Sequence, residues 1–313
     1  MHSSISVSSE GNTAQALKVL LAALLLYCCL LEVVTQAGFP RLSRIQRRIA
    51  SGKLDALALQ ATSAEGAKTL LLVGNSLVVH GVDTEMLRKE MAPRFQSTVF
   101  AIENTQYLDW YFGLRRLFAE GSHPGVVVLC LSTRQLISKG TDGEYFAYYL
   151  MQGRDLLSVR KEAKLDITTT SNFFFANHSA WLGSRVSVRN WLLGELMPNV
   201  EQLTAYLPQQ VSAMPSVDVV VAEGMRRLQT LQALCTGQGA RFVLLIPPSM
   251  RPSDRSDELQ AAAESAGIRV VIPYRAAEMP ASYFEDGFHL NSQGAVAFTE
   301  KLGLALLQEE PRN

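Results

Sequence analysis

Short apolar runs alternate with amphipathic segments over most of this chain of 313 residues, and that alternation limits the folds open to it. Apolar runs of about four to eight residues, each followed by a helical pattern, are typical of buried parallel strands joined by helices. The expected strands are residues 69–73, 99–102, 125–131, 241–246 and 268–272. The expected helices are residues 83–91, 107–120, 219–236, 258–266 and 295–307. The sequence therefore predicts an α/β fold in which helices cover both faces of a central parallel sheet.

The stretch of residues 140–210 lacks this alternation. It carries aromatic clusters at helical spacing, around Tyr145, Phe146, Phe173 and Phe174. We therefore expect a mostly helical insertion. Its aromatic side chains are expected mainly in the core, although some of them could stack on sugars.

Composition excludes several classes of protein. The 29 basic and 29 acidic residues cancel, which does not indicate a general nucleic-acid binder, and 48 % hydrophobic residues exclude a disordered chain. Cys28, Cys29, Cys130 and Cys235 lie in apolar or helix-like runs and are interpreted as small hydrophobic side chains. No cluster of His, Cys, Asp and Glu has metal-ligand spacing, so no metal or other cofactor is expected.

Residues 19–31 form an uninterrupted apolar run near the amino terminus, flanked by Lys18 and Glu32. The run alone is shorter than the ~20 residues of a comfortable span. Residues 16–37 could span a bilayer if both charged side chains reach toward its surfaces, and Thr35-Gln36-Ala37 could serve as a cleavage site. Residues 1–40 are therefore predicted to hold an uncleaved membrane anchor or a signal peptide.

Residues 41–67 are predicted to be a basic juxtamembrane helix or linker. The positive-inside tendency would draw the side after the apolar run toward the cytoplasm. The same residues could instead bind phosphate headgroups of the outer leaflet, with an apolar helical face opposite. Sidedness stays open between these two. The basic residues are Arg41, Arg44, Arg47, Arg48 and Lys53, and the apolar face would be Leu42, Ile45 and Ile49.

Gly74-Asn75-Ser76 directly follows the first expected strand. Ligands of parallel sheets gather beyond the carboxyl ends of the strands, and a Ser at the start of a helix has its own N–H available for an oxyanion. The tripeptide is also an ordinary helix cap. Ser76 is thus a candidate nucleophile that needs a base elsewhere in the chain.

Asp286 and His289 lie in a loop just before the last expected helix. Imidazole takes a proton near neutral pH, and a carboxylate on its other nitrogen fixes the tautomer and stabilises the imidazolium. This pair could activate Ser76. A rival base is His80, which shares a helical face with Ser76 and has Asp83 as its nearest carboxylate.

The two motifs together, VGNSL and DGFHLNSQG, resemble those of the SGNH (GDSL-type) hydrolase family. The likeness covers residues 68–134 and 241–307 of an expected domain at 68–313. It implies a flavodoxin-like three-layer sandwich. It also implies that an ester acyl group is hydrolysed or transferred through an acyl-serine on Ser76, with His289 as base and Asp286 as the orienting acid.

Other blocks of that family are altered here. The family's third strand usually leads into Gly-x-Asn-Asp, and the matching positions hold Ser132 and Arg134. Arg134 could contact an oxyanion or a substrate carboxylate or phosphate, or it could form an ordinary ion pair. Asn104 could donate to the oxyanion in place of the family's second-block glycine. The resemblance therefore leaves Asn104 and Arg134 as candidate oxyanion or substrate-binding residues.

The departures resemble a branch of the family that is attached to bacterial envelope membranes and linked to polysaccharide O-acylation. That likeness implies a single-pass protein of the cell membrane with its domain outside the cytoplasm. The implied substrate is an acylated glycan or a small ester, and the implied partner is a membrane-bound O-acyltransferase. The alternative is a non-catalytic accessory protein that keeps the fold and binds a glycan or such a partner.

Overall fold

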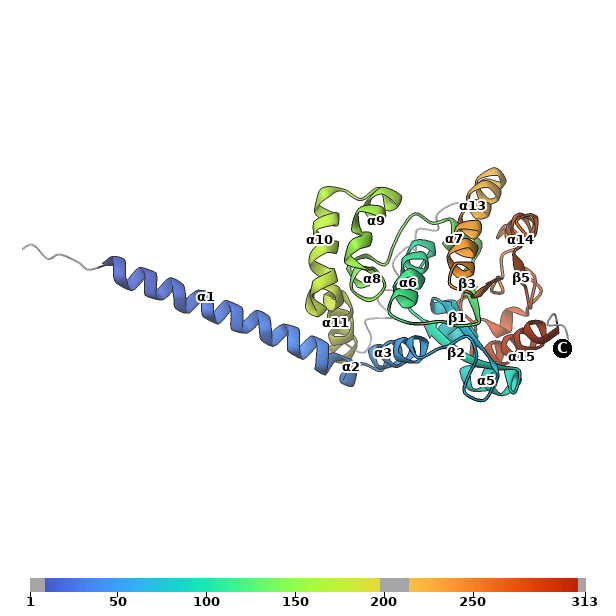
Figure 1. The fold of residues 1–313 in the computed structure, drawn as a ribbon, viewed down its shortest axis with the longest axis horizontal. Coiled ribbons are helices and arrows are strands. Elements are labelled where there is room, and N and C mark those ends of the chain that lie inside the picture. Colours follow the sequence, from blue (N-terminus) through green and yellow to red (C-terminus); the bar gives the residue numbers. More distant parts are fainter. Residues whose placement is uncertain (1–8, 198–213, 309–313) are drawn as a thin grey trace, which may run out of the picture.

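The computed structural model describes residues 9–197 and 214–308, and its centre is a five-stranded parallel sheet. The strands lie in the order β2-β1-β3-β4-β5, which is the flavodoxin-like order. The predicted α/β fold with a central parallel sheet is confirmed (Figure 1). The strands are β1 (Lys68–Gly74), β2 (Phe95–Ala101), β3 (Val126–Cys130), β4 (Arg241–Leu245) and β5 (Arg269–Val271).

Side chains of the central strands alternate between two separate cores, which makes the molecule three-layered. In β1, Leu71 and Val73 enter one core while Leu70 and Leu72 enter the other. The first core also contains side chains of α3 (Arg44–Leu57), α6 (Tyr107–Ala119), α13 (Val217–Thr236) and α14 (Ser256–Ser265). The second contains side chains of α4 (Ser76–Gly81), α5 (Thr84–Met91) and α15 (Ser292–Gln308).

Two elements differ from the sequence-based expectation. Strand β2 begins at Phe95 rather than at residue 99, because it pairs with β1 along its whole length although residues 96–98 are polar. It lies at the edge of the sheet, where polar side chains reach solvent. Helix α7 (Thr133–Ile137) was not expected; Ser132 and Gln135 cap it reciprocally, and it is too short to give a periodic pattern.

The described part of the insertion is helical. It contains α8 (Gly143–Tyr149), a 3₁₀ turn at Gly153–Asp155, α9 (Leu156–Ala163), α10 (Ile167–His178) and α11 (Ala180–Leu196). Tyr145, Phe146 and Phe173 belong to the first core, whereas Phe174 is exposed. Residues 198–210 of the expected insertion lie outside the described residues.

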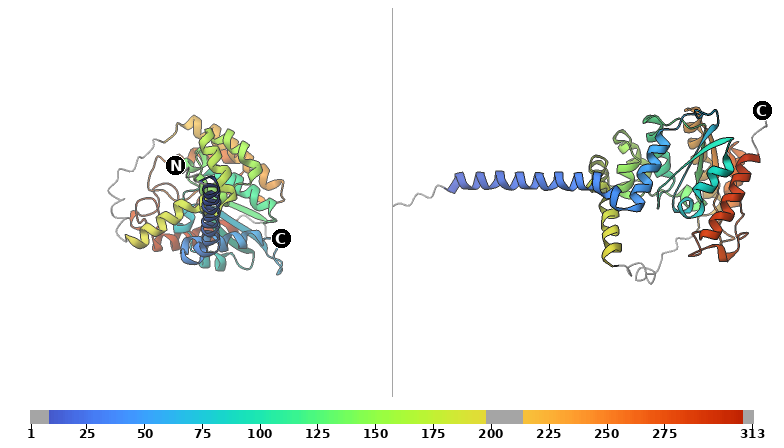
Figure 2. Two further views of the ribbon diagram at one scale, coloured as in Figure 1. Left: turned by 90° about the vertical axis from the view of Figure 1, so that its left-hand side faces the viewer. Right: turned by 90° about the horizontal axis from the view of Figure 1, so that it is seen from below.

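Helix α1 (Ser9–Val33) projects away from the sheet and its covering helices (Figure 2). It continues through a π-helical turn (Val34–Gly38) into α2 (Phe39–Leu42). The segment Thr13–Leu42 is long and apolar enough to cross a membrane, and its most apolar window is not buried; a signal sequence near the amino terminus meets the same criteria. Cys28 and Cys29 are exposed on α1, while Cys130 and Cys235 are buried.

The basic segment after α1 contacts the α/β domain. Ile49 of α3 is buried in the first core. Arg48 forms an ion pair with Glu103, and Lys53 forms one with Glu120. Arg48 and Lys53 were expected either to bind phosphate headgroups or to set the membrane orientation. In the structure, both instead bind carboxylates of the domain itself.

Candidate active site

A tight turn places Ser76 at the carboxyl end of β1. The turn needs glycine at position 74, because a Cβ there would lie 2.5 Å from Val78 Cγ2 and 2.7 Å from the carbonyl oxygen of Cys130. The buried Asn75 side chain accepts a hydrogen bond from the N–H of Leu77 and donates one to the carbonyl of Thr105. The turn is thus held to its own helix and to the loop that follows β2.

His289 and Asp286 come from the loop before α15 and reach the same place. Nε2 of His289 lies 2.9 Å from Oγ of Ser76, and Nδ1 of His289 lies 2.7 Å from Oδ2 of Asp286. When the proton is on Nδ1, His289 donates to the carboxylate and Nε2 is free to accept from the Ser76 hydroxyl. The structure therefore brings the three predicted residues into one hydrogen-bonded chain, across 213 positions of sequence between Ser76 and His289.

The loop itself keeps Asp286 ionised. Partial burial acts to raise the pKa of Asp286, but the backbone N–H of His289, its ring and the N–H of Phe288 donate to the carboxylate and together lower the pKa to about 2. Gly287 permits the bend with a φ of 79°. At neutral pH the carboxylate is charged and can hold the imidazole in one orientation.

The candidate oxyanion donors lie in different positions. Ser76 is the first residue of α4, so its N–H has no acceptor within that helix. Arg134 is half-buried and lines a cavity that His289 also lines. Asn104 is exposed, with a φ of 61°, and within the described ranges it is not among the residues that line this cavity. The structure thus places Arg134 on the wall of the cavity beside His289, while Asn104 directly precedes Thr105, whose carbonyl accepts the Asn75 side chain of the turn before Ser76.

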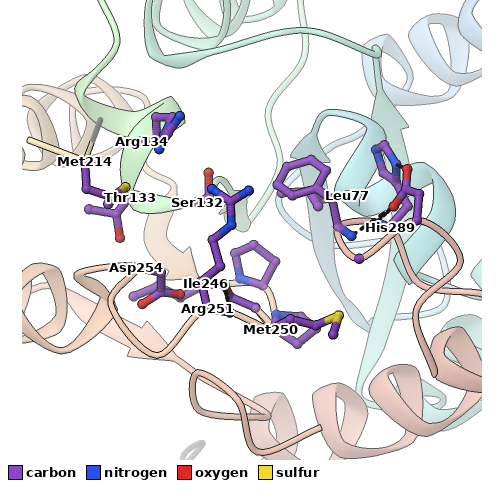
Figure 3. A pocket seen from close by; sticks show the side chains of 16 residues that line it. Leu77, Ser132, Thr133, Arg134, Met214, Ile246, Met250, Arg251, Asp254 and His289 are labelled. Atoms are coloured by element: carbon purple, nitrogen blue, oxygen red, sulfur yellow. Dashed lines mark hydrogen bonds and ion pairs between the residues drawn. The ribbon is translucent and has the colours of Figure 1, made fainter. Parts of the chain in front are cut away.

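The cavity beside His289 has a volume of about 400 Å³ (Figure 3). Ser76 is not part of its lining, but its neighbour Leu77 and its partner His289 are. Sequence analysis missed the loop of residues 246–251, which forms another part of the wall. The available signal was its position after an expected strand, at the edge where parallel sheets bind ligands.

The rival base His80 is exposed and lies against His289, with ring centroids 4.7 Å apart. Among the described contacts, the hydroxyl of Ser76 is hydrogen-bonded to the ring of His289 and not to that of His80. Asp83 is the carboxylate that was expected to orient His80. It instead accepts hydrogen bonds from the N–H groups of Glu85 and Met86 at the start of α5. This geometry favours His289 as the partner of Ser76.

Comparison with known proteins gives a likeness only to solved structures. No protein-family model and no curated protein sequence matches the chain. TesA is 14 % identical with a TM-score of 0.40, covering 77 % of this chain and 98 % of its own. LAE5, an alpha/beta hydrolase enzyme from the metagenome of Lake Arreo, Spain, is 12 % identical with a TM-score of 0.41, covering 80 % of this chain and 97 % of its own.

A catalytic mutant of Axe2, an acetylxylan esterase from Geobacillus stearothermophilus, is 11 % identical with a TM-score of 0.38. The match covers 80 % of this chain and 98 % of that one. Fold and site by themselves define an α/β protein with a Ser–His–Asp hydrogen-bonded chain at the carboxyl edge of its sheet.

Proposed function

We propose that this protein is a membrane-attached serine esterase or O-acyltransferase of the SGNH type. The observation that carries the proposal is the hydrogen-bonded chain from Ser76 through His289 to Asp286, with distances of 2.9 and 2.7 Å. A neutral hydroxyl is a weak nucleophile until a base removes its proton. These distances are those at which an imidazole can do so.

In the proposed reaction, Ser76 Oγ attacks the acyl carbonyl of an ester while His289 Nε2 takes the hydroxyl proton. The N–H of Ser76, with Arg134 or Asn104, stabilises the oxyanion. The tetrahedral intermediate collapses, the C–O bond to the alcohol breaks, and His289 returns the proton to the leaving oxygen. Water or a sugar hydroxyl then attacks the acyl-serine, and the choice between them separates hydrolysis from transfer.

The proposed setting is the bacterial cell envelope, with an anchor in residues 1–40, a basic segment at 41–67 and the α/β domain at 68–313. The exposed apolar helix supports membrane attachment. The altered third block, the long insertion and the amino-terminal apolar segment resemble the envelope branch, which suggests an acylated polysaccharide as substrate and a membrane-bound O-acyltransferase as partner. The domain would then lie outside the cytoplasm.

One observation favours a second candidate function, a non-catalytic accessory protein that binds a glycan or an acyltransferase. The family's third-block asparagine is replaced here by Arg134, which lines the cavity beside His289. The oxyanion site would then lack the family's amide donor at this position.

Labelling of the full chain in detergent with a fluorophosphonate separates these functions, because the probe reacts with an activated serine. We expect labelling of the parent chain and none of Ser76→Ala. The matched control is Ser265→Ala, whose hydroxyl donates to the carbonyl of Ala261 on α14, away from the site. Absence of labelling, or equal labelling of Ser76→Ala, would reject the enzyme and leave the accessory protein.

Membrane attachment is tested by fractionation. The full chain should pellet with membranes and stay there in high salt, because apolar burial is not screened by ions. Release by salt would show that the apolar helix is not an anchor. Loss of residues 1–40 from the purified protein would show a cleaved signal instead.

A further inference from the structure

Two guanidinium groups without an ion-pair partner among the described residues line the cavity beside His289. They belong to Arg134, on α7 after β3, and to Arg251, in the loop after β4. Figure 3 shows both side chains on the cavity wall. Some other arginines of the domain are paired, for example Arg115 with Asp155 and Arg227 with Glu223. Arg134 and Arg251 are distinguished by lining the cavity that His289 also lines.

The two carboxylates of this cavity have other partners. Asp254 accepts the N–H of Ser256, and Asp286 accepts the ring and backbone N–H groups of His289. Neither forms an ion pair with Arg134 or Arg251 within the part of the chain that the structure describes. The charges of the two carboxylates formally cancel those of the two guanidinium groups. Because the carboxylates bind other groups, the guanidinium N–H groups are available to a ligand.

The remaining wall suits the uncharged part of a ligand. Leu77, Ile246, Met250 and Phe288 supply apolar surface to the same cavity. A volume of about 400 Å³ lies within the usual range of small-molecule sites. The cavity can thus hold one half of an ester whose carbonyl lies at Ser76.

We propose that Arg134 and Arg251 form a subsite for a carboxylate or phosphate group on the substrate, so that the protein selects anionic esters. Guanidinium groups bind both anions through paired N–H···O bonds, which give orientation as well as affinity. That the bound anion belongs to a substrate rests on the proposed function. Anion binding by the two arginines does not depend on catalysis.

Binding tests the site independently of activity. The full chain in a non-ionic detergent, as parent and as Ser76→Ala, is titrated with benzoate, phenyl phosphate and the neutral benzamide. We expect at least one anion to bind about tenfold or more tightly than benzamide, because hydrogen bonds to charged groups are the stronger ones. The preference should fall in high salt and vanish in Arg134→Gln/Arg251→Gln. Equal binding of anions and benzamide, or an unchanged preference in the double variant, would overturn the proposal.

The control variant is Arg275→Gln, whose guanidinium pairs with Asp257 and is not among the described residues around the cavity. It should retain the full preference for the anion. A loss equal to that of the double variant would show that overall charge, not the cavity, attracts anions, and would also overturn the proposal.

Kinetics then decide which half of the ester carries the charge. The pair 4-nitrophenyl hydrogen succinate and its methyl ester tests an anionic acyl group, while 4-acetoxybenzoate and its methyl ester test an anionic alcohol. Replacing 4-acetoxybenzoate by 4-acetoxyphenyl phosphate separates phosphate from carboxylate.

We expect kcat/KM to favour the anionic member of one pair by about tenfold or more, and the double variant to lose this ratio. Ser76-dependent turnover with no preference in either pair would refute the anion subsite alone. Turnover that survives Ser76→Ala would refute the proposed function instead.

Discussion

The imidazole of His80 lies against the imidazole of His289, with ring centroids 4.7 Å apart and ring planes inclined by 38°. Of the two imidazoles, that of His289 is the one hydrogen-bonded to the hydroxyl of Ser76 among the described contacts. We therefore expect His289→Gln to lower kcat/KM for an ester by about 10⁴-fold, as losses of triad members do. His80→Gln removes a ring contact only and should cost less than about tenfold. Steady-state kinetics on the two variants check this, and equal losses would return His80 to the role of base.

The acid limit of stability should depend on Asp286. Its pKa is about 2 in the folded protein, against an ordinary value of 3.8, so the folded state binds fewer protons than the unfolded state between these values. The stabilising contribution of this carboxylate is fully present above about pH 4 and is lost as the pH falls through about 2. We expect Asp286→Asn to unfold at lower urea concentration than the parent at pH 5, and the difference to shrink toward pH 2. A difference that stayed constant with pH would contradict the low pKa.

The turn before Ser76 should not tolerate a side chain at position 74. The Cβ of Gly74→Ala would meet Val78 Cγ2 at 2.5 Å and the backbone oxygen of Cys130 at 2.7 Å. Because the second contact is with backbone, we expect a loss of about 1–3 kcal/mol in the free energy of unfolding. The same variant should also show less fluorophosphonate labelling of Ser76 than the parent chain. Gly194→Ala is the control, since its Cβ would meet nothing within 4 Å and helical alanine is favoured over glycine.

The carboxylate of Glu32, at the end of α1, should hold the start of α11. It accepts the hydroxyl of Ser179 and the N–H groups of Ala180 and Trp181. An acidic group at a helix amino terminus stabilises the helix, so Glu32→Ala should cost about 1 kcal/mol locally. Hydrogen exchange at Ala180 and Trp181 should accelerate, while exchange in β3 stays unchanged. Unchanged exchange at both positions would show that α1 and α11 are not coupled in this way.

Much of the fold follows from local sequence signals. The cores of all five strands and of helices α5, α6, α13, α14 and α15 are visible as apolar periodicity, because that pattern reports burial residue by residue. Residues 96–98 of β2 give no such signal, since backbone pairing with β1 rather than side-chain burial makes them part of the strand. Helix α7 is missed for a related reason, because a capping box on five residues leaves no period to read.

The candidate site likewise has a part that is encoded by adjacent residues and a part that is not. Ser76, Asp286 and His289 are recognisable because each lies at a turn whose glycine, cap and helix start are encoded by adjacent residues. The exposure of Asn104 and the pairing of Arg48 with Glu103 are not encoded locally. They depend on which loops and helices become neighbours across the sheet.

The sequence by itself determined the alternating α/β pattern, the apolar amino-terminal helix and the identity of the three polar side chains with complementary chemistry. The tertiary structure alone decided that these side chains meet, that His289 rather than His80 contacts Ser76, and that Arg134 and Arg251 line one cavity. The physical reason is that helix and strand patterns arise from neighbours in the chain. A cavity, by contrast, arises where the ends of β1, β3 and β4 converge from distant parts of it.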